Sequence, residues 1–332
     1  MIIFKPKELK ILTLTTLNVS FENIQTFSEV IGTNDRHLDV LNRFFETTIF
    51  TKGDTIQIKD SNAVKKASLE SVFSILINLV ENSIQINERD VIYIAKLVDD
   101  NVEEAIILDN YINRVEITKT ITGKPIYAKT INQKHYLDAI EKNDLTFGIG
   151  PAGTGKTYVA VLHAVKLLKN GKIRKIVLTR PAVEAGESLG FLPGDLKEKI
   201  DPYLRPLYDA LYEALGTKQT DDLIDKGVIE IAPLAYMRGR TLDNAYVVLD
   251  EAQNTTKGQM KLFLTRLGFE SKMIVTGDIT QVDLPHNKES GLIHATKLLK
   301  NVKGIATIRF ERVDVIRHPL IQKILERYDE ST

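Results

Sequence analysis

The pattern of apolar and polar positions changes its period twice within the first ninety residues. The stretch "NDRHLDVLNRFF" has apolar residues at helical spacing, "TTIFTKGDTIQIKD" alternates around a Gly-Asp turn, and "NAVKKASLESVFSILINLVEN" returns to the helical period. A strand-like run, "LKILTLTTL", precedes them. We therefore expect a small α+β module at residues 1–90.

A different pattern follows a connecting region, which we place at residues 91–125. This region contains one predicted helix, "ERDVIYIAKLVDDN", and a crossing segment with Gly123 and Pro125. After Lys142, short apolar runs alternate with helical patterns. The predicted strands are "LTFGI", "KIVLTR", "VIEIA", "AYVVLD", "KMIVTGD" and "IATIRF", and the predicted helices are "KTYVAVLHAVKLLKN", Leu196 to Leu215 and "GQMKLFLTRLG". Continuous apolar strands between helices are typical of a parallel sheet covered on both faces, so we expect a doubly wound α/β domain at residues 126–330.

A phosphate-binding loop is predicted between the first of these strands and the helix that follows it. The stretch "GIGPAGTGKT" fits the pattern G-x-x-x-x-G-K-[ST] in the context that this motif requires. Glycines let the backbone curl so that its N–H groups face phosphates, the lysine reaches the β and γ oxygens, and the threonine hydroxyl is placed to bind Mg²⁺. The predicted nucleotide-binding residues are Gly150, Pro151, Ala152, Gly153, Thr154, Gly155, Lys156 and Thr157.

An acidic pair follows a later strand, in "AYVVLDEAQN". The strand delivers Asp250 and Glu251 to the carboxyl edge of the sheet, where ligands bind in open α/β folds. We predict that Asp250 holds the metal and that Glu251 polarises the attacking water. The plainer alternative is that these two residues cap the next helix.

The run "VTGDITQVDLP" ends another apolar strand at the same edge. There Asp278 and Gln281 are expected to project toward the γ-phosphate and its water. An amide that accepts from water and donates to phosphate suits a residue that senses the γ-phosphate, and we predict this role for Gln281.

Further residues are compatible with the same site. Upstream of the loop, Gln133 carries a donor and an acceptor that suit the adenine edge, and Tyr136 is placed to pack beside the base. An arginine that neutralises transition-state charge is expected in such enzymes. The residues themselves leave four candidates open: Arg180, Arg309, Arg312 and Arg317.

The composition excludes several other kinds of chemistry. Lys+Arg and Asp+Glu each number 44, so no global charge attracts nucleic acid, and such a partner needs a local patch. Cysteine is absent, and the six histidines show no metal spacing. The N-terminus lacks the features of a signal peptide and no apolar run is long enough to span a bilayer, so we expect a soluble, cytoplasmic protein.

Taken together, the motifs resemble those of the PhoH family of ATPases, in its longer type. The resemblance runs from about Gly123 to Leu320 and includes "GPAGTGKTYVAVLHAV", "RPAVEAGESLGFLPGD", "VVLDEAQNTT", "VTGDITQVDLP" and "DVIRHPL". It implies a RecA-like P-loop NTPase core, ATP and Mg²⁺ as cofactors, RNA-directed helicase-like activity and a hexameric ring. It also implies the nucleotide and metal roles already given and makes Arg317 the first choice of transition-state arginine.

The resemblance also bears on two other regions. The first ninety residues are similar to a KH-like module, which clamps nucleic-acid backbone with a G-x-x-G loop. Here Gly32 is present, but Asp35 stands where the second glycine is expected, which puts phosphate clamping in doubt. Because carboxylates repel RNA phosphates, we expect Glu184 and Glu187 at a subunit contact.

Three functions follow as hypotheses. The first is an ATPase associated with single-stranded RNA in RNA or ribosome metabolism. The second is a nucleotide-gated ring that recruits an endoribonuclease or a ribosome-maturation factor without unwinding RNA itself. Phosphoryl transfer to a small metabolite is disfavoured, because a water-activating Glu251 would waste the ATP.

Overall fold

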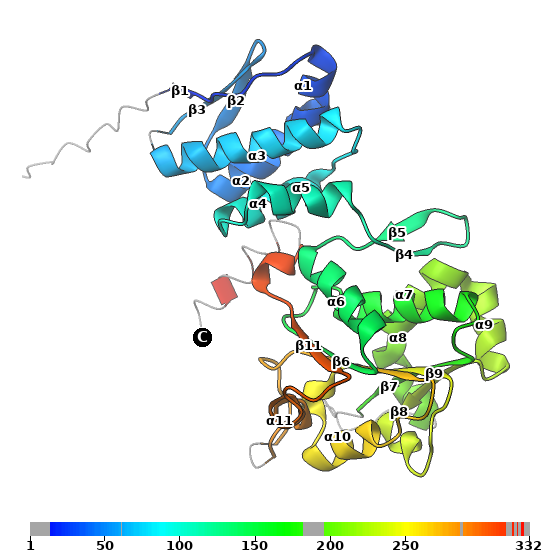
Figure 1. Cartoon of the computed structure of the whole chain (residues 1–332). Helices are drawn as coiled ribbons and strands as arrows, with labels where there is room; N and C mark the ends of the chain where they lie inside the picture. Colours follow the sequence, from blue (N-terminus) through cyan, green and yellow to red (C-terminus); the bar gives the residue numbers. More distant parts are fainter. Residues whose placement is uncertain are drawn as a thin grey trace, which may run out of the picture. The chain divides into compact units, whose positions relative to one another are not determined.

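The computed structural model describes residues 14–60, 62–181, 196–285, 288–316, 321, 324 and 327–328. Contacts between Cα atoms divide the chain into two compact units. Along the sequence, the boundary between them lies between Asn113 and Arg114, and the second unit ends at Val315. Each unit has its own elements (Figure 1).

The first unit is a small α+β fold. Its strands are β1 (Thr15–Thr16), β2 (Ile49–Lys52) and β3 (Thr55–Ile58), and its helical segments are α1 (Ile24–Ile31), η1 (Thr33–Asp35), α2 (Arg36–Phe45), α3 (Ala63–Glu81), α4 (Glu88–Asp99) and α5 (Glu104–Ile112). The strands form an antiparallel sheet in the order β1-β3-β2. The expected α+β class of this module is confirmed, whereas its likeness to a KH module stays a prediction.

Polar caps explain where the helices of this unit begin. Asn62 accepts from the backbone N–H groups that open α3, and Asn87 forms a capping box with Asp90 at the start of α4. The loop from Gly32 to Asp35 joins α1 to α2. Gly32 has φ 77°, and a Cβ atom on it would lie 2.8 Å from the His37 ring, so the turn requires glycine there.

The second unit is a doubly wound α/β core. Its helical segments are α6 (Ile131–Lys142), α7 (Lys156–Lys169), α8 (Leu196–Leu215), α9 (Thr217–Asp225), η3 (Leu234–Met237), η4 (Ala252–Asn254), α10 (Lys257–Leu264), α11 (Gly291–Leu298) and η5 (Arg312–Asp314). Its strands are β4 (Glu116–Lys119), β5 (Pro125–Tyr127), β6 (Leu145–Ile149), β7 (Lys175–Arg180), β8 (Ile229–Pro233), β9 (Ala245–Leu249), β10 (Lys272–Gly277) and β11 (Ile305–Arg309).

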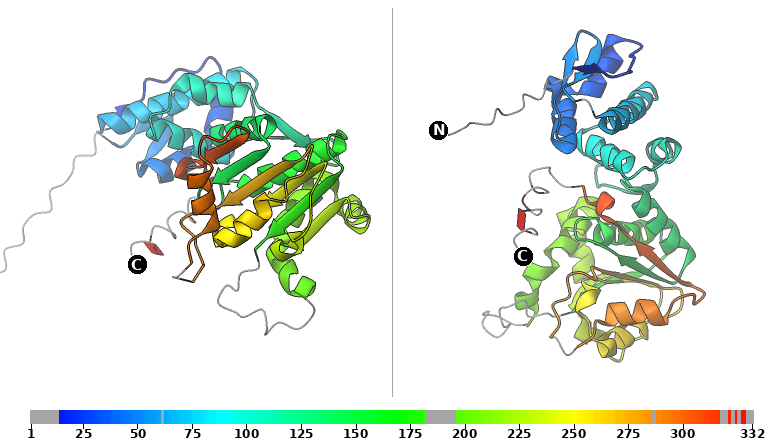
Figure 2. Two further views of the ribbon diagram at one scale, coloured as in Figure 1. Left: turned by 60° about the horizontal axis from the view of Figure 1, so that its bottom comes forward. Right: turned by 90° about the vertical axis from the view of Figure 1, so that its left-hand side faces the viewer.

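Six of these strands form one parallel sheet, in the order β11-β6-β10-β9-β7-β8. In this order β10 lies between β6, which leads into the phosphate loop, and β9, which ends before Asp250. The predicted RecA-like P-loop core with a doubly wound parallel sheet is therefore confirmed. Figure 2 shows the helices that cover the two faces of this sheet.

The buried strands supply side chains to two separate cores. Along β9, Tyr246 and Val248 pack with α6, α7 and α8 on one face, whereas Val247 and Leu249 pack with α10 and α11 on the other. Alternation between two apolar layers explains why these strands are continuous apolar runs in the sequence.

Some elements were not predicted from the pattern. Helices α1, α5, α9 and α11 are eight or nine residues long, so their helical period repeats only about twice. The hairpin β4–β5 lies in the segment that we expected to be a crossing, and its Ile117 and Ile126 are buried in the α7 side of the core. In the part of the chain that the structure describes, no helix has the length and apolar character needed to cross a membrane.

Candidate functional site

The phosphate loop leaves β6 at the carboxyl edge of the sheet and ends at the first residue of α7. Its three glycines all have positive φ: 153° at Gly150, 87° at Gly153 and 80° at Gly155. A Cβ atom on Gly150 would collide with the backbone oxygen of Phe310, the residue after β11. Glycine is required at Gly150 for close approach as well as for backbone conformation.

Lys156, the first residue of α7, lies within this loop. Its ammonium group donates to the backbone oxygens of Gly150 at 2.7 Å and Pro151 at 2.8 Å, and to Thr154 Oγ1 at 3.3 Å. Burial lowers the pKa of Lys156 from its ordinary value, while the carboxylates of Asp278 and Asp250 act in the opposite direction. The pKa of Lys156 therefore depends both on its burial and on the charges of these two carboxylates.

Thr157 and Asp250 meet beside this lysine, as the sequence predicts. Thr157 Oγ1 donates to Asp250 Oδ1 at 2.6 Å, and Thr276 Oγ1 donates to the same oxygen at 2.8 Å. The backbone N–H of Asp250 donates to the backbone oxygen of Thr179 at 2.9 Å, which fixes the end of β9 against β7. Thr276 was missed by the sequence analysis, although it lies two residues before Asp278 on the strand that was singled out.

These residues fit Mg²⁺ by their chemistry. Carboxylate and hydroxyl oxygens are hard ligands of the kind that Mg²⁺ prefers, and Mg²⁺ is usually held by one or two protein groups together with phosphate oxygens. No group of three or more His, Cys, Asp or Glu side chains suited to a metal occurs among the described residues. A magnesium site here would therefore depend on Thr157 and Asp250 together with the nucleotide.

Glu251 follows Asp250 in a backbone conformation that is uncommon for this residue type. Its φ of 51° and ψ of 38° lie in the left-handed region, which turns the chain sharply after β9. Arg180 Nη2 donates to Glu251 Oε1 at 2.6 Å, and Gln253 Nε2 donates to Glu251 Oε2. Both carboxylate oxygens of the predicted water-activating residue thus have a donor.

Gln253 links this carboxylate to the loop after β10. It is 1% exposed, and its Oε1 accepts from the backbone N–H of Asp278 at 3.1 Å. The neighbouring Asn254 accepts from the backbone N–H of Asp283 at 2.8 Å. The loop that contains Gln281 is therefore held by side chains from the segment that contains Glu251, a role for Gln253 and Asn254 that the sequence analysis missed.

Comparison with known proteins places this site in a family. Residues 125–329 match the family described as PhoH, PhoH-like protein. The chain belongs to the PhoH family. A PhoH-like protein of Bacillus subtilis (strain 168) is 53% identical over 318 residues, which cover 96% of this chain and 98% of that protein. Protein PhoH of Escherichia coli (strain K12) is 47% identical over 206 residues, which cover 61% of this chain and 58% of that protein.

Solved structures with a distant likeness to this PhoH-family chain include two Pif1 helicases. The Pif1 helicase from Candida albicans has a TM-score of 0.33 and 12% sequence identity, with 60% of this chain and 43% of that chain covered. So remote a likeness adds nothing to the assignment, which rests on the family match.

Gln133, the predicted adenine reader, lies against the phosphate loop of this PhoH-family core. Its Oε1 accepts from the backbone N–H of Lys129 at 2.8 Å, and its Nε2 donates to the backbone oxygen of Thr154 at 3.0 Å. The Nε2 atom would also lie 2.9 Å from a Cβ atom on Gly155. In this structure Gln133 supports the loop, and contact with adenine stays a prediction.

Tyr136 does not lie where a base would stack. Its side chain is fully buried, packs edge to face against Phe310 at 5.3 Å between ring centroids, and lies against Gly148. The expectation that Tyr136 packs beside the base is therefore wrong. Its burial in the core shows that it lies on the face of α6 that covers the sheet.

The remaining predicted residues fall in three kinds of environment. Gln281 is exposed, although the backbone of its loop is anchored through Asp278 and Asp283. Arg309, the last residue of β11, and Arg312, which follows the strand, are exposed, whereas Arg180 is partly buried beside Asp250 and Glu251. Three predictions fall on residues outside those that the structure describes: Arg317, Glu184 and Glu187.

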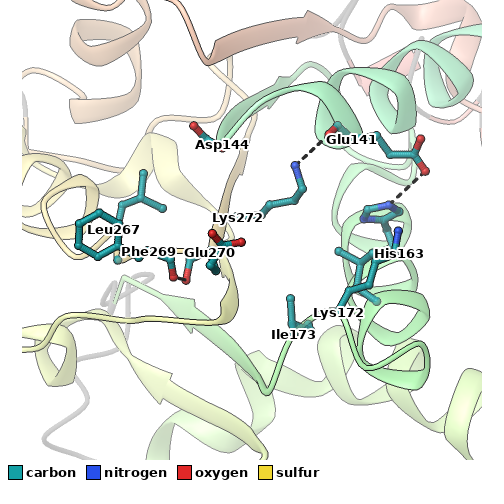
Figure 3. A pocket seen from close by; sticks show the side chains of 12 residues that line it. Glu141, Asp144, His163, Lys172, Ile173, Leu267, Phe269, Glu270 and Lys272 are labelled. Carbon is teal, nitrogen blue, oxygen red and sulfur yellow. Dashed lines mark hydrogen bonds and ion pairs between the residues drawn. The ribbon is translucent and has the colours of Figure 1, made fainter.

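A cavity lies at the edge of the sheet opposite the phosphate loop, where the strands begin. It has a volume of about 670 Å³ and is lined by carboxylates and ammonium groups, among them Glu141, Asp144 and Lys172. Figure 3 shows Phe269 and Glu270 on one side and His163 and Lys172 on the other. Lys272 donates there to the backbone oxygens at the end of α6, so its ammonium group is held by carbonyl oxygens.

Proposed function

We propose that this PhoH-family protein is a Mg²⁺-dependent ATPase. The observation that carries the proposal is the hydrogen bond of 2.6 Å between Thr157, directly after the loop lysine, and Asp250, at the end of β9. This contact unites the two halves of a phosphate and magnesium site that lie far apart in the sequence. Glu251, the next residue, supplies a carboxylate for hydrolysis.

The residues divide the reaction among them. Backbone N–H groups of the loop and the ammonium group of Lys156 hold the phosphates, and Thr157 and Asp250 hold the metal. When bound, Mg²⁺ would neutralise negative charge on the phosphates. Glu251 accepts a proton from water as the water oxygen attacks the γ-phosphorus and the β–γ bridging bond breaks, which gives ADP and inorganic phosphate.

Turnover of ATP by the intact chain tests this proposal. We expect phosphate release that depends on Mg²⁺ and falls at least about 100-fold in Glu251→Gln, with ATP affinity retained because the phosphate loop is unchanged. Lys156→Ala should lose ATP binding as well. A parent protein that binds Mg²⁺–ATP but releases no phosphate would contradict the assignment as an ATPase.

The finer role that we propose is an RNA-associated, helicase-like ATPase of the cytoplasm that works as a hexameric ring. The support for it is the family resemblance of the motifs. The exposed position of Gln281 on a loop anchored to Gln253 is also suited to a residue that responds to the γ-phosphate and to an outside partner. We expect ATP turnover to rise with single-stranded RNA, and more so at low salt, because phosphate contacts are screened by salt.

One observation favours the alternative, a nucleotide-gated ring that recruits a nuclease or a ribosome-maturation factor. The six-stranded sheet is the only parallel sheet among the described residues, whereas motors that separate strands usually close two such lobes on ATP. Measurements of duplex displacement and of RNA-stimulated ATP turnover on the same protein distinguish a helicase-like motor from a recruiting ring. Turnover that is unchanged by RNA across a range of salt but rises with a protein partner would favour recruitment.

A further inference from the structure

Arg180 makes a contact that is unexpected for a transition-state arginine. It is the last residue of β7, and its guanidinium lies between two carboxylates, with Nη2 2.6 Å from Glu251 Oε1 and Nε 3.8 Å from Asp250 Oδ2. Its side chain is 19% exposed. An arginine that stabilises the transferred phosphoryl group needs its N–H groups directed at the phosphate oxygens, whereas Nη2 of Arg180 donates to the predicted base.

Glu251 is also held from the opposite side. Gln253 Nε2 donates to Oε2, the oxygen that Arg180 Nη2 does not contact, and Gln253 itself is anchored by the backbone N–H of Asp278. The Glu251 side chain is 35% exposed and follows a left-handed backbone turn, so it would otherwise reach several rotamers in solvent. Two donors on two oxygens fix the plane of the carboxylate.

We propose that Arg180 is a positioning residue that acts through Glu251 and does not itself contact the γ-phosphate. This inference rests on the proposed ATPase function. A base accelerates proton transfer only when one of its lone pairs lies within hydrogen-bond reach of the water, and small displacements are costly. A carboxylate offers about four acceptor positions, so donors at two of them orient it and leave positions for water.

Single variants give the first test. We expect Arg180→Ala to lower kcat by about 10- to 100-fold, the usual effect of losing a group that orients a functional side chain, and to change KM and the affinity for a fluorescent ATP analogue by less than about twofold. Arg180→Lys should restore part of kcat, because an ammonium can still donate to Glu251 but lacks the planar guanidinium that also lies beside Asp250. An increase of kcat in Arg180→Ala would overturn the proposal, because the contact would then restrain the base.

A double-mutant cycle with Glu251→Gln separates positioning from phosphate contact. If Arg180 acts through Glu251, adding Arg180→Ala to Glu251→Gln leaves the residual single-turnover rate within about twofold. If Arg180 contacts the γ-phosphate, the same addition lowers that rate by the factor seen in the parent, and the proposal fails. Should the parent itself show no ATP hydrolysis, the proposed function fails, and that result is distinct from either outcome of the cycle.

Arg240→Ala is the matched control. Arg240 makes a comparable ion pair, with Nη1 2.6 Å and Nη2 2.8 Å from the carboxylate of Glu230, and its side chain is 30% exposed. Its loss removes one positive charge and one close ion pair outside the phosphate site. We expect Arg240→Ala to keep kcat within about twofold of the parent. An equal loss of kcat in Arg180→Ala and Arg240→Ala would show that losing any such ion pair lowers turnover, and it would overturn the proposal.

Discussion

Thr157 Oγ1 and Thr276 Oγ1 both donate to one oxygen of Asp250, and the two hydroxyl oxygens lie 3.2 Å apart. The three residues come from the start of α7, the end of β10 and the residue after β9. Because two hydroxyl groups from different elements donate to one oxygen of Asp250, the orientation of this carboxylate is fixed before any metal binds. Thr276 thus orients a metal ligand from within the sheet.

Removal of the Thr276 hydroxyl tests this arrangement. Thr276→Val keeps the shape of the buried side chain and deletes the donor to Asp250, so we expect the Mg²⁺ concentration for half-maximal ATP turnover to rise about tenfold. Thr179→Val is the control, because Thr179 Oγ1 is buried with no hydrogen-bond partner among the described residues. Equal Mg²⁺ requirements in the two variants would show that the Thr276 contact does not tune the metal site.

Gln253 is expected to be more important for turnover than for nucleotide binding. Gln253→Leu leaves Glu251 with one donor fewer and the backbone N–H of Asp278 without its acceptor. We expect kcat to fall about tenfold with KM nearly unchanged, measured by steady-state phosphate release. Gln259→Leu on the exposed start of α10, which loses a helix-capping contact, is the control and should keep kcat. A rise in KM without a change in kcat would instead place Gln253 in nucleotide binding.

Gly150 is predicted to be intolerant of any side chain. In Gly150→Ala the new Cβ meets the backbone of Phe310 in a region of φ that alanine avoids, so we expect a loss of about 2 kcal/mol or more in the free energy of unfolding. In Gly171→Ala the strain arises from φ alone, since nothing lies within 4 Å of the new atom, and the loss should be about 1 kcal/mol. Urea titrations of the two variants would measure the difference, and equal losses would mean that the loop shifts away from Phe310.

His163 is predicted to make stability depend on pH. Burial lowers the pKa of His163 to about 4, and Lys166 and Lys272 add to this effect while Glu141 opposes it. The unfolded chain binds a proton near pH 6.5 and the folded chain near 4, so this stabilisation is complete above 6.5 and is lost as the pH falls toward 4. The size should be on the order of 3 kcal/mol.

Unfolding free energies at pH 7, 5.5 and 4.5 would measure this contribution. The difference in stability between the parent and His163→Gln should shrink as the pH falls, because only the parent has the buried imidazole to protonate. His135→Gln, which removes an exposed histidine, should run parallel to the parent. A constant difference between the parent and His163→Gln would show that His163 keeps an ordinary pKa.

The sequence by itself determined the parts of this protein that depend on neighbouring residues. Apolar runs between helical patterns indicated a parallel sheet with two covered faces, and the phosphate loop was complete within ten consecutive residues, "GIGPAGTGKT". Strand ends that must share one edge of a parallel sheet brought Asp250 to the loop. Each of these inferences needs only the spacing of apolar residues or a motif within a short stretch, or the rule that the carboxyl ends of parallel strands lie at one edge of the sheet.

Only the tertiary structure decided which side chains contact one another at that edge. Thr157 meets Thr276 across 119 positions and Arg180 meets Glu251 across 71, because strand order and not sequence distance sets neighbours in the sheet. Helical spacing could not tell whether Tyr136 faced the base or the core, and burial in the core decided it. The sequence names the groups that can bind phosphate and metal, whereas the sheet determines which donors orient them, because orientation depends on distances that no local pattern encodes.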